Sequence, residues 1–195
     1  MPQTALIVRV PEAEGYVNDL RERFDPSARL GVPAHITVLF PFMPPEQVSE
    51  SVRATIASAF AQVAPFAFAL RRGGRFAATA SLMPEPAEPF VALTDALVAS
   101  FPQFPPYGGA HACVVPHLTV ADGDLANVDI AERELSRLLK LRGPVQGACS
   151  SVTLLENSSG RWKELHVFDL GWQHEDRCSG DRRPGGALHR PAGSA

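Results

Sequence analysis

The chain has 195 residues, of which 45% are hydrophobic and 20% charged, and these values are ordinary for one soluble globular domain. The formal net charge of −3 argues against a protein that grips long duplex nucleic acid, because that mode of binding needs many lysines and arginines on phosphates. A small phosphate ligand or the end of an RNA needs only a few donors, so this class of partner stays open.

The same sequence gives no sign of export or of a membrane. The N-terminus, MPQTALIVRV, lacks the basic region and the long apolar segment of a signal peptide. No apolar run approaches the ~20 residues of a membrane span. The three cysteines are odd in number and show no C-x-x-C spacing, which is typical of reduced thiols. We therefore expect a cytoplasmic protein without a membrane partner.

Hydrophobic periodicity predicts strands and helices that follow one another along the chain. Strands are expected at 4–10, 34–40, 65–70, from the turn RRGGR to about 83, and at 112–121, 148–156 and 162–170. Helices are expected at 11–24, from about 44 to 60, and at 90–101 and 128–141. Hairpins placed between helices favour an α+β fold with antiparallel sheets.

The last part of the chain differs in composition from the rest. From His174 onward it has one large aliphatic residue, Leu188, among glycines, prolines and arginines. Such a segment cannot pack a core. We expect one folded domain over 1–173 and a disordered tail over 174–195.

Two short stretches are nearly the same: PAHITVLFPF at 33–42 and VPHLTVA at 115–121. Since a strand has period two, His35 and Thr37 share one face, and so do His117 and Thr119. One such histidine is more often a half-buried structural residue that makes a hydrogen bond. Its recurrence, within a strand and helix outline that also repeats, favours a functional pair.

Two imidazoles and two hydroxyls suit one kind of chemistry. Free imidazole titrates near 6.5, so at neutral pH one histidine can accept a proton while the other donates one. Threonine hydroxyls can donate hydrogen bonds to oxygens that gain negative charge. The motif offers no third ligand at the spacing of a zinc site. These features predict attack at phosphorus in a phosphodiester, without a metal or another cofactor.

The paired H-x-T motifs resemble those of the two-histidine (2H) phosphoesterase superfamily. The branch they resemble is that of the 2′-5′ RNA ligase-like proteins, which include RNA 2′,3′-cyclic phosphodiesterases; the resemblance covers about 3–173. It implies two pseudo-symmetric lobes around a central groove, each lobe an antiparallel sheet with flanking helices. His35 and Thr37 would then face His117 and Thr119 across the groove.

This resemblance implies hydrolysis of a 2′,3′-cyclic phosphate, on an RNA end or a small nucleotide, to a 2′-phosphate. The catalytic residues would be those of the two motifs. No feature of the sequence demands an oligomer, so we expect a monomer. Two alternatives stay open. One is the joining of RNA ends through a 2′-5′ bond, and the other is a module that binds nucleotides or RNA ends with little turnover.

Other candidate residues carry a weaker signal. Arg71, Arg72 and Arg75 are expected at a hairpin turn, where they either reach a phosphate or are simply solvated. Tyr107 precedes the second motif and either stacks on a base or is an exposed loop residue. His111 and His166 lack a threonine two positions later and are interpreted as structural. Trp162 and Phe168 are expected in the core of the last hairpin.

Overall fold

A computed structural model describes residues 1–76, 78–110 and 114–171. The strands are β1 (Thr4–Arg9), β2 (His35–Leu39), β3 (Phe66–Phe76), β4 (Thr79–Glu85), β5 (Leu118–Asp122), β6 (Val145–Cys149), β7 (Ser151–Glu156) and β8 (Lys163–Asp169). The α-helices are α1 (Pro11–Phe24), α2 (Pro26–Arg29), α3 (Glu50–Phe60), α4 (Glu88–Ser100) and α5 (Leu125–Arg142). Short 3₁₀ helices, η1 and η2, cover Pro45–Gln47 and Pro106–Gly109.

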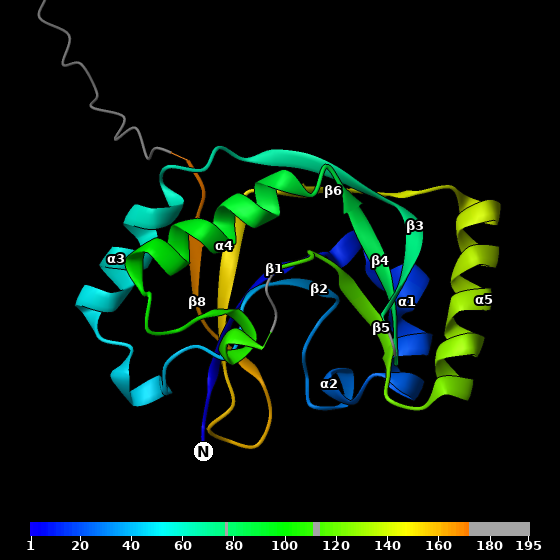
Figure 1. Cartoon of the computed structure of the whole chain (residues 1–195), viewed down its shortest axis with the longest axis horizontal. Coiled ribbons are helices and arrows are strands. Elements are labelled where there is room, and N and C mark those ends of the chain that lie inside the picture. The colour runs from blue at the N-terminus through cyan, green and yellow to red at the C-terminus, as the bar shows by residue number, and fades with distance from the viewer. Residues whose placement is uncertain (77, 111–113, 172–195) are drawn as a thin grey trace, which may run out of the picture.

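The strands form two antiparallel four-stranded sheets, with the orders β2-β1-β7-β8 and β5-β4-β3-β6. Helices α3 and α4 flank the first sheet, and α1 and α5 flank the second (Figure 1). This is the α+β architecture of two lobes that the sequence predicts.

The two lobes interlock through their helices. The chain runs from β1 through α1 to β2 within the first sheet, yet α1 packs against β5 of the second sheet. In the same way α4 lies between β4 and β5 in the chain but packs against β2 of the first sheet. Since each crossing helix covers the other lobe, we propose that the lobes fold as one domain.

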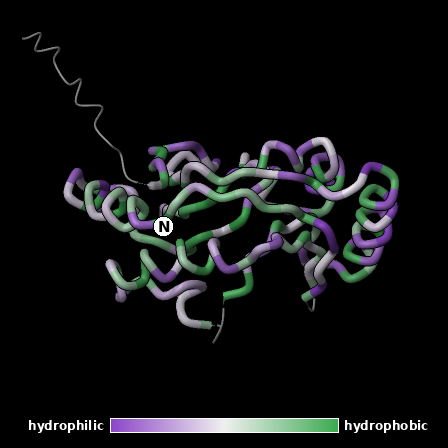
Figure 2. Tube along the Cα trace, turned by 90° about the horizontal axis from the view of Figure 1, so that it is seen from above, coloured by the Kyte–Doolittle hydropathy of each residue, from purple (hydrophilic) through white to green (hydrophobic). Residues whose placement is uncertain are grey.

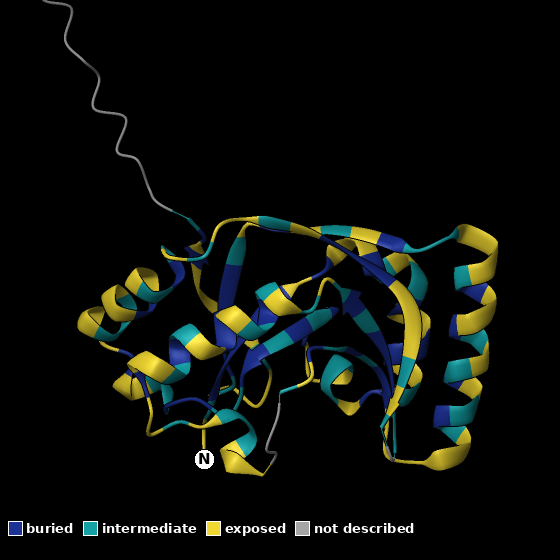
Figure 3. Cartoon of the chain, turned by 45° about the horizontal axis from the view of Figure 1, so that its top comes forward, coloured by how far each residue is buried: buried dark blue, intermediate teal, exposed yellow. Residues whose placement is uncertain are grey.

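The main core lies between the sheets and their helices: hydrophobic and hydrophilic stretches alternate along the chain (Figure 2), and buried residues follow the strands and the inner helix faces (Figure 3). On α1 the inward face carries Ala13, Val17 and Leu20 together with Arg21, a cation that is only 2% exposed. Ser49 caps the N-terminus of helix α3, because its side chain accepts a hydrogen bond from the backbone N–H of Val52. Most predicted elements are present within a few residues of their expected ends, but the helix expected from about 44 to 60 is divided into η1 and α3, and α3 begins only at Glu50.

One predicted turn is wrong. RRGGR does not reverse the chain, because β3 runs through it and pairs with β4, with Gly73 opposite Leu82 and Gly74 opposite Ser81. A Cβ atom on Gly74 would lie 2.5 Å from the sulfur of Met83. The glycine therefore serves close packing within the sheet, and the chain turns after Phe76 instead.

Three boundaries also differ from the prediction. The expected strand at 148–156 is two strands. β7 pairs with β1 in the first sheet, whereas β6 pairs with β3 in the second sheet. Pro26–Arg29 adds one helical turn that the pattern did not predict. The second histidine strand begins at Leu118, and its expected first residues at 112–113 lie outside the described residues, as do His111 and the predicted tail.

None of the helices within 1–76, 78–110 and 114–171 combines the length and the apolar composition that a membrane span needs. The cytoplasmic location expected from the sequence stays a prediction.

Candidate active site

Both H-x-T motifs line one pocket of about 400 Å³. His35 and Thr37 come from β2, and Thr119 comes from β5, with His117 directly before that strand. This volume lies within the usual range for small-molecule sites. The four side chains that the sequence pairs by pattern, 82 positions apart, are therefore brought together by the fold.

The alternation of side chains along β2 explains why the first motif faces the pocket. Across the β1–β2 ladder, Ile7 lies opposite Thr37, and the register shifts by one residue between Ile7 and Leu6. Ile36 and Val38 point to the main core and are buried, whereas His35 and Thr37 are partly exposed. Packing from behind thus holds the polar pair in place.

The two histidines make the same hydrogen bond. Nδ1 of His35 lies 2.8 Å from the carbonyl oxygen of Pro33, and Nδ1 of His117 lies 2.8 Å from that of Val115. A carbonyl oxygen only accepts, so Nδ1 carries the proton in each ring. In the neutral ring Nε2 is then the basic nitrogen, available to take up a proton in the pocket.

The surroundings of the two rings are unequal. The pKa of His35 is lowered to about 4, mainly by burial and to a smaller extent by the positive charge of Arg21. The hydrogen bond to Pro33 and the carboxylate of Asp25 act in the opposite direction, and the nearby His117 adds a small lowering. His117 instead packs against the ring of Phe76, with the ring centroids 4.8 Å apart.

The segment before His35 is tied to α1. The backbone N–H of Ala34 donates to Glu14 at 2.8 Å, and Arg21 donates to the carbonyl oxygen of Val32 at 3.1 Å. Arg21 also pairs with Asp25, which lines the pocket. These contacts fix the backbone from which the first imidazole projects.

The pocket includes several residues that the sequence reasoning did not select: Asp25, Ser27, Phe40, Thr79, Asp122 and Trp162. Trp162 was expected in the core, but it lies at the pocket wall and is only partly buried. Phe168, by contrast, is buried as predicted. The spacing of Arg21 and Asp25, four residues apart at a helix end, was the one available signal for their ion pair.

The weaker candidates do not line this pocket. Arg71 and Arg72 lie within β3 and pair with Glu85. Arg75 reaches across to α5, where it pairs with Asp129 and Glu132 at 2.6 and 2.8 Å. Each of the three arginines therefore has a carboxylate partner outside the pocket, and the expected contact with a phosphate stays a prediction.

Tyr107 also lies outside the pocket lining. Its backbone adopts the left-handed conformation, with φ of 52°, in the 3₁₀ segment η2. Its backbone N–H donates to the carbonyl oxygen of Phe40 at 2.6 Å, and burial raises the pKa of its hydroxyl. Tyr107 thus supports the pocket through Phe40. His166, which the sequence assigned a structural role, contacts Phe168 on β8.

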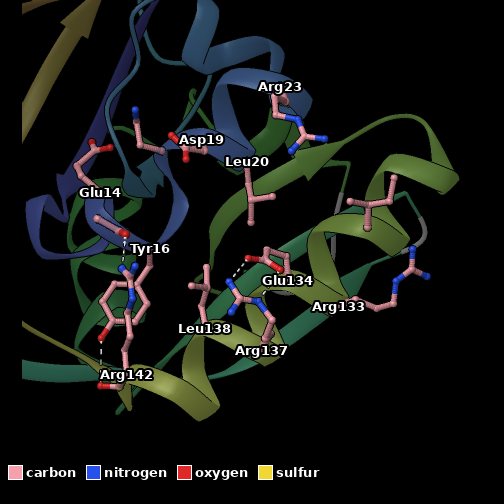
Figure 4. A pocket seen from close by; sticks show the side chains of 13 residues that line it. Glu14, Tyr16, Asp19, Leu20, Arg23, Arg133, Glu134, Arg137, Leu138 and Arg142 are labelled. Carbon is pink, nitrogen blue, oxygen red and sulfur yellow. Dashed lines mark hydrogen bonds and ion pairs between the residues drawn. The ribbon is translucent and has the colours of Figure 1, made fainter.

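A larger hollow, of about 1030 Å³, lies between α1 and α5 and contains neither motif (Figure 4). Two of its four arginines have partners within the hollow: Arg137 pairs with Glu134 at 2.6 Å, and Arg142 lies over the ring of Tyr16 and donates to the carbonyl oxygen of Gly15. This hollow is a groove between packed helices. The smaller pocket is the candidate active site.

Comparison with known proteins agrees with this geometry. A family model described as the 2′-5′ RNA ligase superfamily matches residues 9–161. No curated protein sequence matches the chain. Among solved structures, TT0787 of Thermus thermophilus is 20% identical with a TM-score of 0.56, over 88% of this chain and all of that one.

Escherichia coli LigT has the same fold. Its complex with 3′-AMP gives a TM-score of 0.54 at 17% identity, over 87% of this chain and 99% of LigT. Its complex with NADP⁺ gives 0.52 at 17% identity, over 87% and 98% of the two chains. The family model spans most of the chain and includes both histidine motifs, so the chain belongs to the 2′-5′ RNA ligase superfamily of two-histidine phosphoesterases.

Proposed function

We propose that this protein hydrolyses 2′,3′-cyclic phosphates of nucleotides or RNA ends to 2′-phosphates, without a metal. The observation that carries the proposal is the convergence of two histidines and two threonines in one pocket, with each histidine's Nδ1 bound to a carbonyl oxygen. Such an arrangement leaves both Nε2 atoms for proton transfer.

In this mechanism His35 accepts a proton from water, because its lowered pKa keeps it neutral near pH 7. The oxygen of that water attacks phosphorus, and the bond from phosphorus to the 3′ oxygen breaks. His117 donates a proton to the departing 3′ oxygen, which leaves the phosphate on the 2′ oxygen. Thr37 and Thr119 donate hydrogen bonds to the phosphate oxygens as negative charge increases.

Metal independence is proposed from the donor set. In the described part of the chain, no three residues of the types His, Cys, Asp and Glu come together as a metal site would require. The LigT structures contain 3′-AMP and NADP⁺, which supports nucleotides as the ligand class here. One chain supplies both motifs, so we propose that a monomer is sufficient for activity.

The family favours one further activity, the joining of RNA ends through a 2′-5′ bond. A ribose hydroxyl would replace water as the attacking group, and the same two histidines would transfer the protons. Water is present at far higher concentration than any ribose hydroxyl, so hydrolysis ranks first. A module that binds nucleotides with little turnover does not require two titrating groups and ranks last.

The test is turnover of 2′,3′-cyclic AMP and of an RNA with a cyclic-phosphate end, in the presence of a chelator. We expect the wild type to form the 2′-phosphate, which phosphorus NMR distinguishes from the 3′ isomer. His35→Ala and His117→Ala should each lower the rate ~10²–10⁴-fold. His166→Ala is the matched control, because this histidine lies outside the pocket. Absence of turnover on both substrates would contradict the proposal.

A further inference from the structure

Arg9 lies on the same face of the first sheet as the first histidine motif. In the ladder between β1 and β2, Arg9 is the cross-strand partner of His35, and Ile7 is the partner of Thr37. Side chains two positions apart in a strand share a face, so Arg9 projects on the side of Ile7, which lines the candidate active site. Cross-strand neighbours have Cβ atoms about 4.5–5.5 Å apart. The side chain of Arg9 therefore begins directly beside the imidazole that accepts a proton in the proposed mechanism.

The ion pair of Arg9 is exposed and bridges two strands that are not neighbours. Its Nη1 atom lies 3.4 Å from Oε2 of Glu164 on β8, and the two side chains are 52% and 49% exposed. Glu164 is the cross-strand partner of Leu155, another residue that lines the pocket, so it projects on the same face. Since β7 lies between β1 and β8, the side chains of Arg9 and Glu164 meet above that strand, next to the pocket.

This ion pair can be exchanged for a stronger one at little cost. Its distance of 3.4 Å is longer than that of a typical hydrogen bond, and exposed pairs of this kind contribute little to stability. Arg75 differs, because two carboxylates hold its guanidinium at 2.6 and 2.8 Å. A phosphate offers a guanidinium two oxygens in bidentate geometry, which is stronger than one long contact with a carboxylate. A phosphate that reaches Arg9 would therefore displace Glu164.

Among the residues that the structure describes, the lining of the pocket includes no lysine or arginine. It includes two carboxylates instead, those of Asp25 and Asp122. The buried Arg21 behind the pocket is already paired with Asp25. An RNA carries a negative charge at every linkage, and a phosphate beyond the reacting one gains from a cation outside the lining. Arg9 supplies such a cation beside the first motif.

We propose that Arg9 binds the phosphate that links the reacting nucleotide to the preceding one in an RNA, and that Glu164 holds Arg9 until this phosphate displaces it. This inference rests on the proposed function and names the substrate that the site prefers. That substrate is an RNA end, since a nucleoside 2′,3′-cyclic phosphate lacks the linkage that Arg9 contacts. The guanidinium is paired both with and without substrate, so the exchange leaves no charge without a partner.

The experiment compares two diadenosine substrates that both end in a 2′,3′-cyclic phosphate. One has a phosphodiester between its nucleosides and the other a neutral methylphosphonate, so they differ in the charge that Arg9 would bind. At fixed ionic strength, the wild-type kcat/KM should be higher for the phosphodiester by roughly three- to thirtyfold, which is below the value for a buried charged contact because water screens Arg9. Arg9→Gln should bring this ratio of kcat/KM values close to one. Arg137→Gln removes an arginine from another exposed pair, on α5, and should leave the ratio as in the wild type.

Glu164→Gln tests the exchange of partners. This variant frees Arg9, so the ratio should rise a few-fold, whereas the same substitution in an Arg9→Gln background should not change it. An equal rise in both backgrounds would mean that Glu164 only repels the phosphate, and would overturn the exchange. A wild-type ratio near one, or the wild-type ratio in Arg9→Gln, would overturn the role of Arg9 while leaving the proposed hydrolysis intact.

A binding measurement tests Arg9 even if neither dinucleotide is hydrolysed. The probes are the corresponding phosphodiester and methylphosphonate dinucleotides that end in a 2′-phosphate, titrated by calorimetry. Tighter binding of the phosphodiester by the wild type, lost in Arg9→Gln, would support the role of Arg9 and count only against the hydrolysis. Equal Kd values for the two probes in the wild type would overturn the role of Arg9.

Discussion

Arg21 and Asp25 form a buried ion pair beside the candidate catalytic histidine His35. Arg21 Nη2 lies 3.0 Å from Asp25 Oδ2, and the two side chains are only 2% and 4% exposed. Asp25 also accepts hydrogen bonds from the backbone N–H and the hydroxyl of Ser27, at 2.9 and 2.7 Å. The pair therefore joins the end of α1 to the segment that leads into the first motif.

The first prediction concerns this pair. Asp25→Asn keeps the side-chain cap on α2 but leaves the guanidinium of Arg21 without its counter-charge. Removing one partner of a buried pair costs about 3–5 kcal/mol, and we expect a loss of stability in this range. The measurement is urea unfolding at pH 7. Arg21→Met combined with Asp25→Asn should recover at least half of the loss, since it removes the unpaired charge. A cost below about 1 kcal/mol for Asp25→Asn would contradict the prediction.

The second prediction concerns stability against pH. Burial lowers the pKa of His35 from 6.5 to about 4, so below pH 6.5 the unfolded chain binds a proton that the folded chain does not. Stability is therefore unaffected above pH 6.5 and decreases as the pH falls from 6.5 toward 4. Linkage gives a loss of roughly 2–3 kcal/mol at pH 4.5 from this group alone.

His35→Gln removes the titrating group and provides the comparison. Urea unfolding of both proteins at pH 7 and pH 4.5 isolates the contribution of His35 from that of the carboxylates, which both proteins share. The wild type should lose more stability than the variant over this interval, by the stated amount. Equal losses in the two proteins would mean that His35 titrates alike in the folded and unfolded states.

The sequence was sufficient for the two motifs because strand periodicity alone places His35 with Thr37, and His117 with Thr119. It was insufficient for the place of Trp162 at the pocket wall, since the segment before β8 is held there by a backbone hydrogen bond to Leu30, which is far away in the chain. RRGGR was misread because paired glycines usually mark a turn, whereas here Gly74 makes room for Met83. Local patterns carry no information on such contacts between distant segments.

The third prediction concerns the two threonines. Thr37→Val and Thr119→Val preserve the shape of each side chain and remove one hydroxyl from the pocket. If both hydroxyls stabilise the negative charge that develops on the phosphate, each variant should lower kcat on the order of 10²-fold, with a smaller change in KM. Thr55→Ala is the control, because Thr55 lies on α3 and its hydroxyl donates to the backbone of Ser51. A full rate in either valine variant would remove that threonine from the mechanism.

The fourth prediction concerns the dependence of rate on pH. If His35 accepts the proton from water, kcat/KM should fall only when His35 becomes protonated in the free protein. Its lowered pKa of about 4 places this acidic limb well below the 6.5 of an ordinary imidazole. The proton donor must in turn stay protonated, so the rate should also fall at high pH and the profile should be bell-shaped.

The measurement is kcat/KM for 2′,3′-cyclic AMP between pH 4 and 9, with circular dichroism at each pH to show that the protein stays folded. Asp25→Asn offers a further test over the pH range in which this variant stays folded, because the carboxylate of Asp25 raises the pKa of His35. Its removal should move the acidic limb to still lower pH. An acidic limb at 6.5 or above in the wild type would contradict this prediction, because a base with a pKa of about 4 stays unprotonated well below that pH.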